Sequence, residues 1–117
     1  MSDSPNSFVE VLYTPEFKRN VRALAKKYPH IRSDVQPLID QLQRGEWIGN
    51  QVQGTGYTIF KVRIRNSDIS RGKSGGYRAI YYLKTQTAVV LITIYSKTEQ
   101  SDISAAKIRK ILAELSE

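Results

Sequence analysis

The sequence has 117 residues, 40% apolar and 25% charged, which is enough for one soluble domain that buries about two-thirds of its unfolded surface. It contains no cysteine and one histidine, which excludes disulfides, thiolate nucleophiles and cysteine-based zinc sites and disfavours a histidine-rich metal site. The longest apolar run, residues 88–94, falls short of the roughly 20 residues needed to span a bilayer. Residues 1–7 lack the basic and apolar segments of an export signal, so we expect a cytoplasmic protein with no membrane association.

The net charge of +7 is concentrated in one part of the chain. Residues 61–84 carry seven Lys or Arg and one Asp. By contrast, residues 1–60 carry seven basic and six acidic residues, and residues 85–117 carry four of each. A localised basic face is typical of proteins that bind polyanions, whereas a solubilising charge is usually scattered. A solvated basic loop with no nucleic-acid role is the alternative at this point.

The N-terminal residues predict a tail, a strand and a helix. Residues 1–7 predict a disordered tail, and residues 8–117 a single domain. Residues 8–13 alternate enough for a short strand at a sheet edge. Thr14 and Pro15 then have the pattern of an N-cap and a first helical residue, which predicts a helix ending near Tyr28 and Pro29.

A second helix is predicted to end near Gln43, before Gly45. Its apolar face predicts a start at about Ile31 or Ser33. Pro37 would cost about 3 kcal/mol in a helix interior, which favours either a start near Asp34 or a kink. The two helices predict a hairpin packed on the apolar face of a sheet.

Three strands are predicted next, over residues 60–65, 76–83 and 87–97. Apolar and basic residues alternate along the first of them. The apolar ones are Phe60, Val62 and Ile64, and the basic ones are Lys61, Arg63 and Arg65. Residues two apart on a strand share a face, so one face is apolar and the other cationic. Short connections favour an antiparallel meander with one side packed and the other free, and we expect the free side to meet RNA.

The last strand and the segment after it complete the fold prediction. Strict alternation would place Val90, Ile92 and Ile94 on one face of the strand and Val89, Leu91, Thr93, Tyr95 and Lys97 on the other. The chain turns helical from Asp102, and Glu99 and Asp102 are expected to cap that helix. The order of elements predicts an α+β fold with helices on one face of a largely antiparallel sheet.

Three segments carry a family resemblance: KVRIR at 61–65, GGYRAIYYL at 75–83 and LITIYSKTEQSDIS at 91–104. In order and spacing the chain resembles the RelE superfamily of type II toxins, and most closely its HigB branch. The resemblance implies a ribosome-dependent mRNA interferase, which cleaves the codon in the ribosomal A site beside 16S rRNA. It also implies an antitoxin partner and no small-molecule cofactor.

The resemblance also implies roles for individual residues. Lys61 and Arg63 match the basic pair that contacts mRNA and takes part in catalysis, and Arg65 matches a further basic residue. Arg78 matches the arginine that steadies the scissile phosphate, and Tyr95 and Lys97 lie where the family places other active-site side chains. On the loop, Arg71 and Lys73 are expected to contact the RNA backbone.

Cleaving RNA without a metal requires a base for the 2′-hydroxyl, stabilisation of the phosphorane and an acid for the leaving 5′-oxygen. The planar guanidinium of arginine can bind two phosphate oxygens at once, which suits stabilisation of the phosphorane. A neutral Lys61 is one hypothesis for the base, because neighbouring cations disfavour the charged form of its side chain. Thr98 stands where an arginine is common in the family and Ser104 where a tyrosine would fall, so the acid and base stay unassigned.

Two other functions remain open for this sequence. A toxin of the same fold can poison DNA gyrase without cleavage, as the related ParE proteins do, but ParE proteins generally lack a complete cationic cluster. A non-catalytic RNA- or ribosome-binding module is the other. At single positions, Arg78 has the alternative of a structural ion pair, and His30 that of a simple turn residue.

Overall fold

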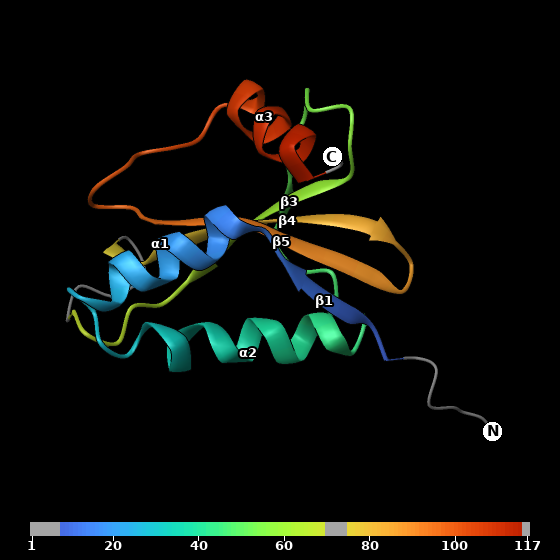
Figure 1. Ribbon diagram of the computed structural model, residues 1–117. Coiled ribbons are helices and arrows are strands. Elements are labelled where there is room, and N and C mark those ends of the chain that lie inside the picture. The colour runs from blue at the N-terminus through green and yellow to red at the C-terminus, as the bar shows by residue number, and fades with distance from the viewer. Residues whose placement is uncertain (1–7, 70–74, 116–117) are drawn as a thin grey trace.

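The computed structural model describes residues 8–69 and 75–115, and the predicted tail at 1–7 lies outside them. These described residues form a five-stranded mixed sheet and three helices (Figure 1), which confirms the predicted α+β class. The strands are β1 (Glu10–Tyr13), β2 (Asn50–Gln51), β3 (Ile59–Ile64), β4 (Tyr77–Thr85) and β5 (Ala88–Ser96). The helices are α1 (Pro15–Ala25), α2 (Ile31–Gln43) and α3 (Ala105–Leu115).

The sheet has the strand order β1-β5-β4-β3-β2. Strands β3, β4 and β5 form the predicted antiparallel meander. The short β1 lies at one edge, as predicted, and pairs in parallel with the first half of β5, while β2 closes the other edge. The second half of β5 extends beyond β1, so α1 can contact it directly.

Thr14 fixes α1 to β5. Its Oγ1 accepts a hydrogen bond from the backbone N of Phe17 at 3.0 Å, which is the predicted N-cap, and donates to the carbonyl of Ile92 at 2.6 Å. Further along α1, the Asn20 side-chain amide donates to the carbonyl of Ile94 at 3.1 Å. Side chains of α1 therefore satisfy strand carbonyls that β1 is too short to reach.

Helix α2 begins at Ile31 and continues through Pro37 to Gln43, so it does not start near Asp34. Proline removes one backbone donor and leaves the carbonyl four residues earlier, that of Ser33, without its helical partner. Ser33 and Pro37 are both exposed, so water can satisfy this carbonyl. Ile31, fully buried, holds the first turn against the core.

The prediction that all helices cover one face of the sheet is wrong. Helices α1 and α2 pack on one face, around a core that includes Phe17, Leu42 and Tyr81, whereas α3 packs on the opposite face (Figure 1). The core under α3 consists of Ile59, Ile80, Ile92, Ile108, Ile111 and Leu112. Ile59 of β3, Ile80 of β4 and Ile92 of β5, with Tyr82 packed against them, give this face an apolar patch that α3 buries.

A register shift in β5 corrects the predicted alternation. Ile80 pairs with Thr93 and Tyr81 pairs with Leu91, so Ile92 is the extra residue of a bulge. As a result Ile94 faces the α1–α2 core together with Leu91, although strict alternation placed them on opposite faces. Tyr95 moves to the α3 face with Ile92.

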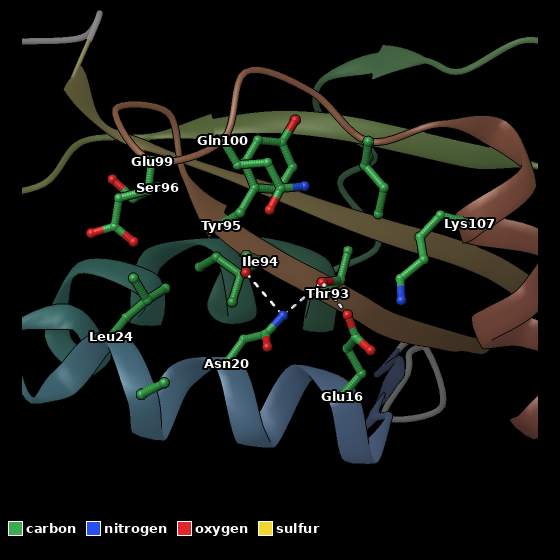
Figure 2. A pocket seen from close by; sticks show the side chains of 12 residues that line it. Glu16, Asn20, Leu24, Thr93, Ile94, Tyr95, Ser96, Glu99, Gln100 and Lys107 are labelled. Carbon is green, nitrogen blue, oxygen red and sulfur yellow. Dashed lines mark hydrogen bonds between the residues drawn. The ribbon is translucent and has the colours of Figure 1, made fainter.

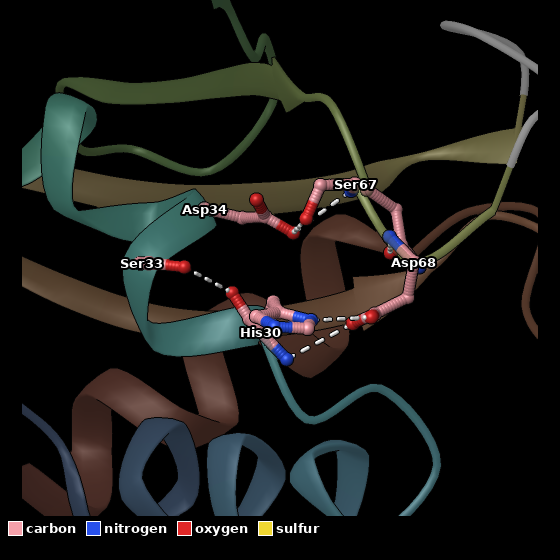
Figure 3. A network of polar contacts seen from close by, with 6 residues as sticks. His30, Ser33, Asp34, Ser67 and Asp68 are labelled. Carbon is pink, nitrogen blue, oxygen red and sulfur yellow. Dashed lines mark hydrogen bonds and ion pairs between the residues drawn. The ribbon is translucent and has the colours of Figure 1, made fainter.

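His30 is more than a turn residue, because it ties the helical hairpin to the turn after β3. Its Nδ1 lies 2.6 Å from Asp68 Oδ1, and its backbone N donates to Asp68 Oδ2 at 2.9 Å (Figure 3). Asp34 accepts hydrogen bonds from the backbone N and the hydroxyl of Ser67. The hydrogen bond to Asp68 raises the pKa of His30 above its usual range.

Within the described residues, no helix is long and apolar enough to cross a membrane.

Candidate functional site

Four of the predicted site residues lie together on the α3 face of the sheet. Arg63 of β3 is opposite Arg78 of β4, which is opposite Tyr95 of β5. Side chains of directly opposed residues in an antiparallel sheet lie on the same face. Lys61 is two residues from Arg63 on that face. We call Lys61, Arg63, Arg78 and Tyr95 the cross-strand row.

Arg78 is the buried member of the row. Only 8% of its surface is exposed, and its Nη1 donates to the carbonyl of Tyr77 at 3.2 Å. Across the described part of the chain, no Asp or Glu oxygen lies within 4.0 Å of its guanidinium, so the alternative of a structural ion pair is not observed. A buried cation without an opposite charge is costly, and a bound anion would relieve that cost.

Gly76 allows β3 and β4 to approach closely just before Arg78. A Cβ atom at this position would lie 2.2 Å from the backbone carbonyl oxygen of Ile64, where no side chain fits. The glycine in GGYR therefore allows the close backbone approach that sets Arg78 opposite Arg63.

Asp102 joins the row from the segment before α3. Its Oδ1 accepts from Lys61 Nζ at 2.9 Å and from the hydroxyl of Tyr95 at 3.5 Å. The hydrogen bond from Lys61, together with one from the backbone N of Ile103, lowers the pKa of Asp102. Asp102 is thus a carboxylate at neutral pH, among cations that attract phosphate.

The prediction that Asp102 and Glu99 cap the last helix is wrong. Ser104 is the N-cap of α3, because its Oγ accepts from the backbone N of Lys107 at 3.1 Å. Glu99 instead pairs with Lys27 at 2.9 Å. An Asp ahead of a helix has the sequence pattern of a cap, and no local signal indicates that Lys61, distant in sequence, binds it.

Tyr95 keeps its proton at neutral pH. Burial raises the pKa of its hydroxyl, and the nearby Asp102 carboxylate adds to this effect, while Arg78 opposes it. The site therefore combines a carboxylate that can accept a proton, a phenol that can donate one and arginines that can bind phosphate oxygens.

A comparison with protein families identifies the family of this chain. The sequence model of one protein family, the RelE toxin of the RelE / RelB toxin-antitoxin system, matches residues 17–116. The chain belongs to the RelE toxin family. It is therefore a toxin of a toxin-antitoxin system, and its family gives it an antitoxin partner.

Two further predicted residues of this RelE-family toxin, Lys97 and Arg65, directly follow strands of the cross-strand row. Lys97 follows β5 and its Nζ donates to the carbonyl of Ser101 at 2.7 Å, so it braces the segment that carries Asp102. Arg65 is exposed just after β3, two residues beyond Arg63. Arg71 and Lys73 lie outside the described residues.

Proposed function

We propose that this RelE-family toxin, of the HigB-like branch, is an endoribonuclease that cleaves mRNA in the ribosomal A site without a metal ion. The proposal rests on the environment of Arg78. Its guanidinium is buried, has no carboxylate partner in the described chain and lies between Arg63 and Tyr95 in the sheet. A phosphodiester is the anion that such a row of donors fits, since arginine binds two phosphate oxygens in a planar fork.

Asp102 supplies the base that the sequence left unassigned. Lys61 has a carboxylate 2.9 Å away, so mutual repulsion among cations no longer accounts for a neutral lysine base. In the proposed reaction Asp102 takes the proton of the 2′-hydroxyl, and the 2′-oxygen forms a bond to phosphorus. Lys61 orients the carboxylate and carries charge toward the phosphate.

Tyr95 is the proposed general acid. As the bond between phosphorus and the 5′-oxygen breaks, the phenol proton passes to that oxygen, leaving a 2′,3′-cyclic phosphate and a 5′-hydroxyl. Arg78 stabilises both the phosphorane and the phenolate that Tyr95 becomes, because it favours the charged form of Tyr95. Attack and departure lie on opposite sides of phosphorus, so the phosphate must enter between Asp102 and Tyr95.

This geometry also supports dependence on the ribosome. In the free chain the hydroxyl of Tyr95 is 3.5 Å from Asp102 and Lys61 is 2.9 Å from the same oxygen, so acid and base contact each other. Substrate positioned by 16S rRNA would separate them and supply much of the reduction in barrier that orientation provides.

The test is primer extension on a defined mRNA, incubated with the purified toxin in the presence and absence of translating ribosomes. Cuts within codons only when ribosomes are present would support the proposal, and cuts on naked RNA would contradict the ribosome dependence. A folded toxin that makes no cuts, but inhibits gyrase supercoiling, would favour the ParE-like alternative. Binding to ribosomes without cuts or gyrase inhibition would favour the non-catalytic module.

A further inference from the structure

A cavity with both polar and apolar walls opens beside the cross-strand row, and Tyr95 is the one residue of its lining that the reaction proposed above uses. Its volume is about 440 Å³, and it lies between α1, the end of β5, the segment after β5 and the first turn of α3 (Figure 2). Ligand pockets typically have about 300–1,000 Å³. Tyr95 belongs to both the row and the cavity wall, so a nucleotide whose phosphate lies on the row is next to the cavity.

The cavity walls suit a nucleobase better than a phosphate. Glu16 places a carboxylate on the wall that would repel a phosphate group, whereas the carboxylate of Glu99 pairs with Lys27. Leu24 and Ile103 provide apolar surface for the faces of a flat ring. Bases of single-stranded RNA are commonly bound this way, between apolar surfaces and with their edges hydrogen-bonded.

Two opposite charges face the cavity without pairing with each other. Glu16 extends from α1 and Lys107 from α3, and Figure 2 shows the two side chains pointing toward each other. Within the described residues no ion pair under 4.0 Å joins them, and the contacts of Glu16 are an ion pair with Arg19 at 3.6 Å and a weak hydrogen bond from Thr93 at 3.4 Å. Both groups retain hydrogen-bonding capacity across the gap.

Asn20 and Thr93 hold the floor of the cavity rigid. The Asn20 amide donates to the hydroxyl of Thr93 at 2.8 Å and to the carbonyl of Ile94 at 3.1 Å (Figure 2). These bonds fix α1, and with it Glu16, at a set distance from β5. A carboxylate held in this way can discriminate between ligands.

Guanine is the base whose edge matches this arrangement. It presents two adjacent donors, N1–H and the N2 amino group, next to the O6 acceptor. Adenine, cytosine and uracil each lack the adjacent pair of donors. We propose that the cavity binds a guanine of the RNA substrate, with Glu16 accepting from N1–H and N2–H and Lys107 donating to O6. The inference rests on the proposed function for RNA as the source of the base.

The first test measures binding without cleavage. Uniformly ¹⁵N-labelled toxin is titrated with the neutral nucleosides guanosine, inosine and adenosine. Guanosine should shift the Asn20 side-chain amide and the backbone amides of Thr93 and Lys107 saturably. Inosine lacks the N2 amino group and should bind about 5- to 150-fold more weakly, the range expected for losing a bidentate base contact. Equal binding of guanosine and adenosine, or shifts only outside the cavity, would overturn the assignment.

Protein variants test the same contact from the other side. Glu16→Gln should bind guanosine and inosine with equal affinity, because an amide cannot accept both donors of guanine. The matched control is Arg19→Gln, which removes the exposed ion-pair partner of Glu16 but lies outside the cavity wall and should leave the difference between the nucleosides unchanged. A Glu16→Gln protein that still prefers guanosine as the parent does would contradict the proposal.

The second test links the cavity to cleavage and separates the two proposals. Ribosomes are programmed with mRNAs that carry guanosine or inosine at each position of one codon, and cuts are mapped by primer extension. Guanosine should be preferred at one position, and Glu16→Gln should abolish that preference. Specific guanosine binding with no cleavage would sink the proposed nuclease and leave the cavity assignment standing. Cleavage with neither guanosine binding nor guanosine preference would overturn the cavity assignment and leave the proposed nuclease standing.

Discussion

Replacing Arg78 with methionine should reduce activity without reducing stability. Only 8% of the Arg78 surface is exposed, and among the described residues its side chain has one hydrogen bond, to the Tyr77 carbonyl at 3.2 Å, and no ion pair to break. Methionine has a similar length and carries no charge to desolvate. Since apolar replacements of buried charges are often neutral or stabilising, the free energy of unfolding should stay the same or rise by about 1–4 kcal/mol.

The same substitution removes the guanidinium that the proposed mechanism places on the phosphorane. Loss of one such stabilising donor typically reduces kcat by about 10²–10³, or roughly 2.7–4 kcal/mol. Guanidinium chloride denaturation measures stability, and ribosome-dependent primer extension measures cleavage. Lys84→Met, at an exposed position of the same strand, is the control and should change neither. A destabilised Arg78→Met protein that still cleaves at the parental rate would refute the reasoning.

Substitutions at three further positions test other parts of the molecule. Asp102→Asn should reduce cleavage by about 10²–10⁴ without unfolding the exposed segment, and full activity in primer extension would exclude Asp102 as the base. The pKa of His30 is raised and that of Asp68 is lowered by their contact. The pair therefore contributes fully to stability between the ordinary pKa values of the two groups, 3.8 and 6.5. This contribution is lost as pH rises through the folded-state pKa of His30. The difference in Tm between the parent and His30→Asn should therefore shrink from about pH 5.5 to about pH 8.5, and a constant difference would contradict this. Thr14→Ala removes a helix cap and leaves the buried carbonyl of Ile92 unsatisfied, so chemical denaturation should show a loss of about 2–4 kcal/mol, whereas Thr14→Ser should lose little.

Local patterns in the sequence determined most of the secondary structure. Thr14 and Pro15 marked the start of α1 because capping and a fixed proline φ act within one turn. Alternation along residues 60–65 predicted which side chains of β3 share a face, and Lys61 and Arg63 lie on the face opposite the α1–α2 core as expected. The helix start and the strand alternation each depend only on residues a few positions apart in the sequence.

Alternation failed where a partner strand changed the geometry. Nothing in the run from Ala88 to Ser96 indicates that Ile92 forms a bulge, because the run is apolar on both faces and fits either register. The bulge decides which face Tyr95 occupies. In strict alternation Tyr95 would share a face with Leu91, which lies in the α1–α2 core.

The sequence by itself determined the class of fold and the concentration of positive charge, since these follow from composition and short-range periodicity. Only the tertiary structure decided that α3 covers the face opposite α1 and α2, that Arg78 is buried without a carboxylate partner in the described chain and that Asp102 meets Lys61 and Tyr95. Lys61 and Asp102 are 41 residues apart, and their contact depends on how β3, β5 and the segment before α3 pack together. Interactions over such separations have no local signature, because they arise from the packing of elements that the local sequence specifies one at a time.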